Sequence, residues 1–141
     1  MSEDLTGAEM EHLLAAETIA RIGCEAEGRI YVVPVSYVYD GDSIFGVAWD
    51  GLKVRAMRKR PGVCIEVDRT VGGLVESVIA WGTYEELEGE ARNDALAVMH
   101  LGAPPARAKS GRTATPAIVY RIKLTRKTGR RERPFRRLPS S

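Results

Sequence analysis

The chain has 141 residues, of which 44% are hydrophobic, and its formal net charge is +2. This length fits one domain with a core of its own, and the composition excludes global disorder. Apolar runs such as residues 30–35 are far too short to cross a bilayer, and no apolar segment of a secretion signal follows the acidic start. We therefore expect a cytoplasmic protein with no membrane partner.

The first predicted element is a short amphipathic helix over residues 7–16. Thr6 and Glu9 have the spacing of a capping box, in which each side chain bonds the backbone N–H of the other residue. Met10, Leu13 and Leu14 then form one apolar stripe.

Strand-like segments follow. The run 29–39 is rich in Val and Tyr, and its Pro34 predicts an edge position or an interrupted ladder. The residues 40–42, Asp-Gly-Asp, predict a hairpin turn between this run and the next. The six predicted strands are residues 19–24, 29–39, 43–48, 63–67, 74–87 and 117–124.

Further helices are predicted over residues 51–60 and 91–101, and a Pro/Ala/Gly-rich loop over 102–116. The long run 74–87 contains Gly82, where we expect a bend. A mainly β chain with peripheral helices and six antiparallel strands suits a small barrel better than a sandwich.

Charge is unevenly distributed along the chain. Residues 121–137 hold nine basic residues and one acidic residue, whereas the rest holds twelve basic and eighteen acidic residues. Because apolar periodicity ends after Leu124, we expect residues 1–129 to form the domain and 130–141 a flexible, solvated basic tail. Phe135 is its single aromatic residue, so nucleic acid is not an expected partner, although such a tail can bind phosphate backbones without sequence preference.

The sequence lacks several catalytic and binding motifs. It contains no dinucleotide fingerprint, no P-loop, no CxxC pair and no Gly-x-Ser-x-Gly elbow. Two histidines supply a metal site poorly, so we expect no metal. Cys24 and Cys64 lie in strand-like runs and are predicted to be reduced core thiols. Function would then depend on a bound cofactor that carries the chemistry.

Three stretches together resemble a known family. Residues 34–45 read PVSYVYDGDSIF, Gly51 and Lys53 follow with one residue between them, and residues 60–68 read RPGVCIEVD. In this order and spacing they resemble the pyridoxamine 5'-phosphate oxidase-like superfamily, nearest to its short nitroimidazole-resistance-protein-like branch. The similarity extends over about residues 8–131.

The resemblance implies an FMN-binding split β-barrel that works as a homodimer, with flavin at the subunit interface. The family's phosphate-binding lysine matches Lys53, at the start of a predicted helix. An ammonium and the positive end of a helix there would both attract the phosphate dianion.

The resemblance also implies where the flavin ring lies. It would follow the segment of Val33, Pro34, Val35 and Ser36, where Ser36 can hydrogen-bond the polar edge of the ring. A second contacting segment matches Val47, Ala48 and Trp49, although a tryptophan there fits core packing equally well.

One position departs from the family pattern. Nitroimidazole-resistance proteins commonly carry a histidine where this chain has Gly46, which argues against nitroreduction by their particular mechanism. The substrate-phosphate clamp of the true pyridoxamine-phosphate oxidases is also missing, so vitamin B6 oxidation is not expected.

Two functions remain open at this point. The first is an FMN-dependent oxidoreductase that acts on a small electrophilic substrate, with NAD(P)H as a candidate donor; the catalytic residues stay unassigned because reduced flavin itself delivers the hydride. The second is a non-catalytic flavin or haem carrier or sensor whose basic tail could contact nucleic acid.

Overall fold

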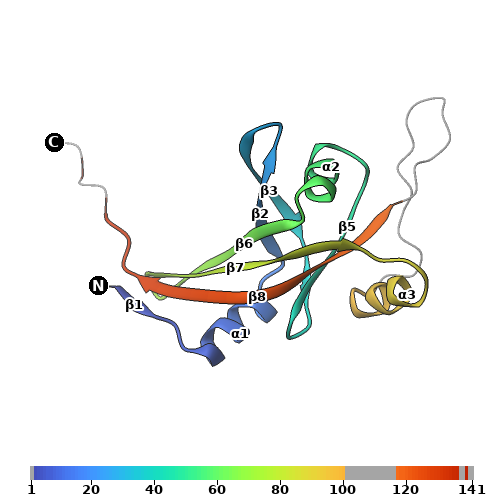
Figure 1. Ribbon diagram of the computed structural model, residues 1–141. Coiled ribbons are helices and arrows are strands. Elements are labelled where there is room, and N and C mark those ends of the chain that lie inside the picture. Colours follow the sequence, from blue (N-terminus) through green and yellow to red (C-terminus); the bar gives the residue numbers. More distant parts are fainter. Residues whose placement is uncertain (1, 101–116, 137–138, 140–141) are drawn as a thin grey trace.

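The computed structural model describes residues 2–100, 117–136 and 139 (Figure 1). All strands belong to one antiparallel sheet in the order β3-β2-β6-β7-β8-β5-β4, and β1 pairs with β8 off this path. The strands are β1 (Ser2–Asp4), β2 (Ile19–Ala26), β3 (Arg29–Ser36), β4 (Val38–Tyr39), β5 (Ser43–Ala48), β6 (Gly62–Val71), β7 (Leu74–Glu86) and β8 (Ile118–Glu132). The helices are α1 (Gly7–Ala16), α2 (Leu52–Lys59) and α3 (Gly89–Val98).

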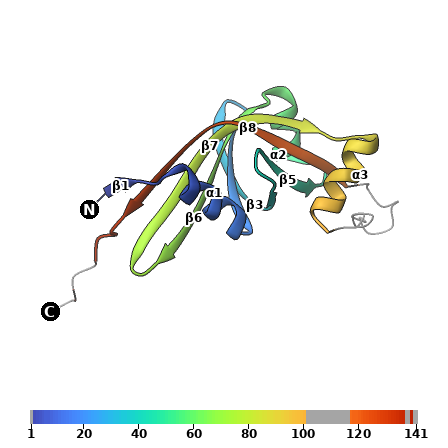
Figure 2. The same ribbon diagram turned by 90° about the horizontal axis from the view of Figure 1, so that it is seen from below.

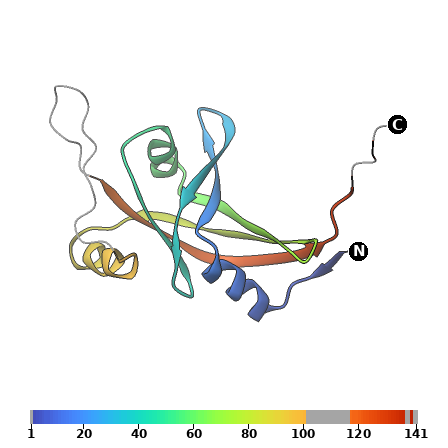
Figure 3. The same cartoon turned by 180° about the vertical axis from the view of Figure 1, so that it is seen from behind.

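The sheet curls into a half-barrel around one main core. The β2–β3 hairpin and the β4–β5 pair cross the long ribbon of β6, β7 and β8 (Figure 3), and the curvature is visible from below (Figure 2). Fully buried side chains from the strands and from α1 and α2 meet inside, among them Leu13, Ile22, Met57, Ile65 and Tyr120. The predicted antiparallel split barrel is therefore confirmed.

The number of strands differs from the prediction. The sheet has eight strands instead of six, because β1 is added and the predicted run 29–39 breaks at Tyr37. The backbone N–H of Tyr37 donates to the Thr18 carbonyl at 3.1 Å, and its hydroxyl donates to the Leu14 carbonyl at 2.6 Å. These bonds fix the break between β3 and β4. β3 is an edge strand, as Pro34 predicted.

Several local predictions are confirmed. Both hydrogen bonds of the capping box between Thr6 and Glu9 are present, and α1 covers residues 7–16. The register of β7 against β8 shifts between Trp81 and Gly82, so the expected bend is a β-bulge. A Cβ at Gly82 would lie 2.4 Å from the Lys123 carbonyl oxygen, which explains the glycine.

The boundary of the basic tail is corrected. β8 continues to Glu132, where residues 130–132 pair with both β1 and β7. Arg131 bonds Glu76 across the sheet, and its side chain is only 18% exposed. The sequence prediction failed because these basic residues are ordered by ion pairs and by neighbouring strands, neither of which apolar periodicity reports.

Other boundaries shift slightly. α2 is two residues shorter than the predicted helix 51–60, and α3 begins at Gly89 and ends at Val98. The predicted loop 102–116, residue 101 and residues 137, 138, 140 and 141 lie outside the described residues. None of the helices that the structure describes has the length and apolar character needed to span a membrane.

Candidate functional site

The connection from β5 to α2 leads into a helix start that no side chain caps. Gly51 is the N-cap residue in extended conformation, and it makes no side-chain bond to the first turn. The helical ladder begins where the N–H of Arg55 donates to the Gly51 carbonyl at 3.0 Å. The preceding amides and the positive end of the helix dipole therefore face any anion that approaches here.

Lys53 is the charged side chain at this helix start. It is half-buried, and burial lowers the pKa of its ammonium below the ordinary value. Within the described part of the chain no carboxylate forms an ion pair with it, whereas Arg58 on the same helix pairs with Glu86. A half-buried cation without a partner costs free energy that a bound anion would offset.

The four predicted flavin contacts on β3 divide between two faces of the sheet. Val35 is buried and Val33 packs against the main core. Pro34 and Ser36 are exposed on the outer face. Only the last two side chains are therefore free to touch a ligand from outside the barrel, because alternate residues of a strand face opposite ways.

The side chains of the second predicted segment, residues 47–49, also face different sides of the sheet. Val47 packs against the cluster that α3 forms with Phe45 and Leu87, whereas Ala48 is buried in the main core. Trp49 is half-buried beyond the end of β5, and its indole Nε1 is buried with no hydrogen-bond partner in the described part of the chain.

A small pocket joins the two predicted segments. It has a volume of about 210 Å³ and is lined by Ser36, Tyr37, Val38, Gly46, Val47 and Met99. Ser36 and Val47 are thus brought together, but Lys53 does not line this pocket. Its volume is also below the roughly 300–1,000 Å³ typical of ligand sites. This pocket alone is therefore too small to enclose a flavin.

Sequence reasoning gave no indication of Tyr120, which packs in the main core behind this pocket. It lies on β8 directly opposite Gly46 of β5, is fully buried, and its hydroxyl has no hydrogen-bond partner among the described residues. The sequence drew attention to position 46 only because a glycine stands there where nitroimidazole-resistance proteins commonly carry a histidine. Only the strand pairing reveals that a tyrosine side chain occupies the space beside that glycine.

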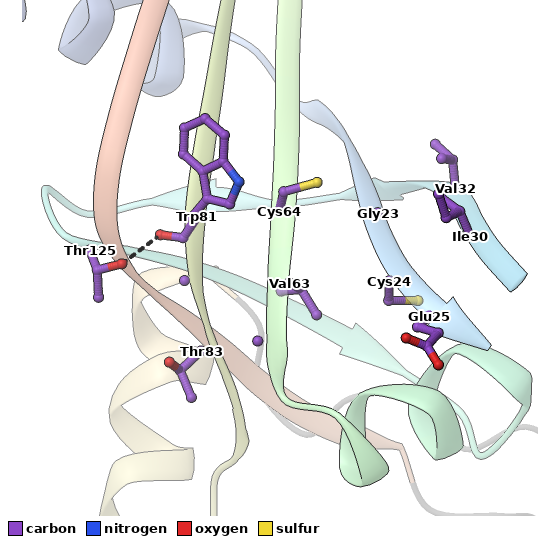
Figure 4. Close-up of a pocket in the computed structure, with 12 residues that line it drawn as sticks. Gly23, Cys24, Glu25, Ile30, Val32, Val63, Cys64, Trp81, Thr83 and Thr125 are labelled. Atoms are coloured by element: carbon purple, nitrogen blue, oxygen red, sulfur yellow. Dashed lines mark hydrogen bonds between the residues drawn. The ribbon is translucent and has the colours of Figure 1, made fainter. Parts of the chain in front are cut away.

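The outer face of β3, β2, β6 and β7 is unusually apolar. Across it the register aligns Val32, Gly23, Cys64 and Trp81 in one row (Figure 4). Val32 is 60% exposed and neighbouring Ile30 is 90% exposed. This row lies along an open pocket of about 440 Å³. Exposed apolar patches of this size are typical of surfaces that bind another molecule.

Cys64 is therefore only partly a core residue. Both cysteines are free thiols, and Cys24 is buried as predicted. Cys64 instead faces the outer row, where a Cβ on Gly23 would lie 2.8 Å from its sulfur. The glycine makes room for the thiol on this face.

The next row of the same face is charged. Arg21 bonds Glu66 at 3.1 Å and Asp68 at 2.9 Å. Burial, reinforced by the neighbouring Asp68 carboxyl, raises the pKa of Glu66 to about 7. Pro34 pairs with Arg21, and Ile79 pairs with Glu66, so all four residues belong to one row across the sheet. The strand predicted to contact the flavin therefore lies on the same surface as the apolar row.

Comparison with known proteins identifies the family. A family model described as pyridoxamine 5'-phosphate oxidase matches residues 6–131. The chain belongs to this family. The family resemblance inferred from the three motifs is thereby confirmed. A curated relative, an uncharacterized protein of Rhizobium meliloti, is 29% identical over 80 residues, which cover 56% of this chain. The match spans 53% of that relative, about half its length.

Solved structures of the same architecture agree with this assignment. A FAD-binding protein of Mesorhizobium loti is 27% identical, with a TM-score of 0.76 over 93% of this chain and 98% of that chain. A proposed 5-nitroimidazole antibiotic resistance protein of Bacteroides thetaiotaomicron is 18% identical, with a TM-score of 0.74 over 93% and 87%. The flavocytochrome Anf3 of Azotobacter vinelandii is 17% identical, with a TM-score of 0.68 over 99% and 72%. The last two likenesses concern the fold alone.

Proposed function

We propose that this protein binds FMN and holds its phosphate at Lys53. The supporting observation is the half-buried ammonium without an ion-pair partner among the described residues, beside an uncapped helix start. A phosphate dianion fits this donor set, because it accepts charge-assisted bonds from an ammonium and from helix N-terminal amides. The FAD-binding relative from Mesorhizobium loti leaves FAD as the competing flavin.

The flavin ring lies along the outer side of Pro34 and Ser36 in this proposal. These two side chains face outward on the edge strand β3, where no further strand covers them in the main sheet order. The pocket between Ser36 and Val47 receives one edge of the ring. Its volume of about 210 Å³ requires that other walls complete the site.

A second copy of the chain supplies those walls. The apolar row of Val32 and Trp81 lies on the same outer face as Pro34, so covering this row also covers the flavin strand. Burial of such a surface is the main driving force of association. We therefore propose a homodimer with flavin at the interface.

Bound flavin supplies hydride or electron transfer, and the protein binds and orients it. The pocket lining of Ser36, Val38, Gly46, Val47, Met99 and the bonded Tyr37 offers no carboxylate, imidazole or ammonium. Such a lining favours a small uncharged electrophile as substrate, and NAD(P)H is the candidate donor to be tested. The alternative is a non-catalytic flavin carrier, and turnover distinguishes the two.

Nucleic acid is not a partner in this proposal. Several basic side chains along β8 form ion pairs with carboxylates, as in the pairs of Arg121 with Glu85 and Lys127 with Glu11. Paired cations release fewer counterions on binding a phosphate backbone, which weakens nonspecific affinity.

The test is titration of the purified protein with FMN and with riboflavin. Lys53→Ala should weaken FMN binding by about 1.5–3 kcal/mol, or roughly 10- to 150-fold, and leave riboflavin binding nearly unchanged. Lys59→Ala, on the exposed end of the same helix, is the matched control. An unchanged FMN affinity of Lys53→Ala would remove this lysine from the site.

Two further measurements complete the test. Light scattering should give twice the mass of the chain, and Val32→Asp should give a monomer. Consumption of NAD(P)H with a quinone or nitro compound would support the oxidoreductase, whereas bound flavin without turnover would favour the carrier.

A further inference from the structure

The charged row on the outer face of the sheet carries one cation and two carboxylates. Both carboxylates bond the same guanidinium nitrogen, since Nη1 of Arg21 donates to Glu66 at 3.1 Å and to Asp68 at 2.9 Å. We call these three residues the Arg21 cluster. When both carboxyl groups are ionised, one guanidinium neutralises only one of the two negative charges, so the cluster carries an excess negative charge.

The Arg21 cluster lies within the surface that we propose as the dimer interface. Its three side chains line an open hollow of about 380 Å³ together with the apolar side chains of Val32 and Ile79, among others. Neighbouring rows on one face of a sheet are about 7 Å apart, and a stable interface covers about 800 Å² on each partner. A second copy that covers the row of Val32 and Trp81 therefore also covers the cluster.

The nearest cations on other strands are engaged elsewhere. In the rows of Cys64 and Asp68, β8 contributes Arg126 and Arg130. Arg126 lies over the Trp81 ring, 5.4 Å from its centroid, and Arg130 bonds the Asp4 carboxylate at 3.2 Å. Strands β3 and β7 present uncharged side chains to the cluster, and the free thiol of Cys64 is the titratable group beside it on β6. Within one subunit the cluster therefore keeps its excess charge.

Covering this charge favours the binding of a proton. An uncompensated charge is costly to bury, and a carboxyl group avoids that cost by becoming neutral. Already in the single chain, burial and then the neighbouring Asp68 carboxyl raise the pKa of Glu66 to about 7. The Glu66 side chain is still 32% exposed, so a second copy that excludes the remaining solvent raises its pKa further. At and above neutral pH, the dimer therefore binds more protons than two separate chains.

We propose that this protein dimerises with uptake of one proton per subunit at Glu66, so that the dimer weakens as the pH rises above neutrality. The inference rests on the proposed homodimer and names its regulation. Because the second copy also covers the proposed flavin strand, flavin affinity falls together with the affinity between the subunits.

The test is the pH dependence of dimer dissociation, measured by sedimentation equilibrium on the full chain with and without FMN. The wild-type Kd should be constant below about pH 6 and should rise above about pH 7 by roughly tenfold or more per pH unit, because a separating dimer releases up to two protons. Glu66→Gln replaces the carboxyl group with a neutral side chain of the same shape, so its dimer should stay equally tight over this pH range. If Glu66→Gln does not fold, Asp68→Asn replaces it, since Arg21 then neutralises the single remaining carboxylate.

Glu25→Gln is the matched control on the same face. Glu25 lines the open pocket beside Cys64 and Trp81, and its carboxylate pairs one to one with Arg60 at 3.3 Å. Because this charge is already neutralised within the subunit, the substitution should leave the dependence of the Kd on pH intact.

The outcomes separate this inference from the proposed homodimer. A wild-type dimer whose Kd does not change over this pH range would overturn the proton uptake and indicate that a cation of the second copy neutralises the cluster, while the homodimer stands. A pH dependence that persists in Glu66→Gln would also overturn it, and loss of that dependence in Cys64→Ser would assign the proton to the thiol. A protein that stays monomeric at every pH would overturn the homodimer and this inference together.

Discussion

The polar side chains at one end of this half-barrel are paired with one another, whereas several at the other end have no partner among the described residues. Where β1, β7 and β8 meet, Arg131 bonds Glu3 at 2.7 Å and Glu76 at 2.7 Å and also pairs with Glu9. Glu76 in turn accepts from Arg69 at 3.0 Å. We call these five residues the terminal cluster. At the β5–α2 end, by contrast, Lys53, Trp49 and Tyr120 have no such partners within the described residues.

This difference indicates that the terminal cluster stabilises the fold, whereas the β5–α2 end is available to bind a ligand. In the terminal cluster, a backbone bond from Thr6 and then Arg131 lower the pKa of Glu9 to about 2, so the charged forms stabilise the fold. At the β5–α2 end burial acts against the charge of Lys53. Substitutions in the first region should therefore reduce stability and preserve ligand binding, and those in the second should do the reverse.

The largest expected effect on stability is that of Arg131→Gln. The change leaves the buried Glu76 with Arg69 alone and detaches Glu3 and Glu9. Removal of one member of a poorly exposed ionic network leaves an uncompensated charge. Thermal unfolding should show a midpoint lower by several degrees, with FMN affinity unchanged below that midpoint.

Arg133→Gln is the control for this substitution. Arg133 lies just beyond β8 and is exposed, so its loss should leave the midpoint unchanged. Equal losses from both substitutions would mean that overall charge, and not the terminal cluster, determines stability.

Truncation tests the corrected end of the domain. A chain that ends after Glu132 keeps the pairing of β8 with β1, whereas a chain that ends after Arg130 loses Arg131. The first should unfold like the full chain and the second like Arg131→Gln. Loss of flavin from the shorter chain alone, at a temperature where it is folded, would contradict the separation of the two regions.

Lys53→Met should have a smaller and opposite effect on stability. Removing a half-buried charge whose pKa is lowered by burial should slightly stabilise the flavin-free protein, because solvent screens much of the cost of burying it. The same variant should lose FMN affinity. Chemical denaturation with and without FMN measures both, and a destabilised flavin-free variant would show that the ammonium has an unrecognised partner.

The smallest effect concerns pH and Glu66. Its pKa is about 7 in the folded protein against an ordinary 4.5, so the folded state binds more protons between these values. The free energy of unfolding should therefore fall as pH rises through this window, by less than about 1 kcal/mol because the carboxylate is partly solvated. Glu66→Gln should flatten the curve, and an unchanged slope would assign the dependence to another group.

The sequence was most informative where short-range chemistry decides structure. The capping box at Thr6 and Glu9, the Asp-Gly turn before β5 and the bend at Gly82 all depend on neighbouring residues, and each is present. The alternation of apolar residues likewise identified the long strands. The run 29–39 was the exception, because a tertiary bond from Tyr37 to Leu14 interrupts it.

The sequence predicted which segments form the candidate site but not which of their side chains face outward. The family resemblance predicted Lys53 and the segments around Pro34 and Trp49 as flavin contacts, and these contacts stay a prediction. It gave no means to tell that Val33 and Val35 face the core while Pro34 and Ser36 face outward, since this depends on which side of the sheet becomes the interior.

The sequence by itself therefore determined the antiparallel β class, the first helix and its cap, the family, and a lysine at a helix start. The tertiary structure alone decided that Arg131 belongs to the sheet, that Tyr120 fills the space beside Gly46, and that one face of the sheet is left apolar. The physical reason is the range of the interactions. Caps, turns and alternation arise from residues a few positions apart, whereas cross-strand ion pairs, side-chain displacement and exposure depend on strands that are distant in the chain and meet only on folding.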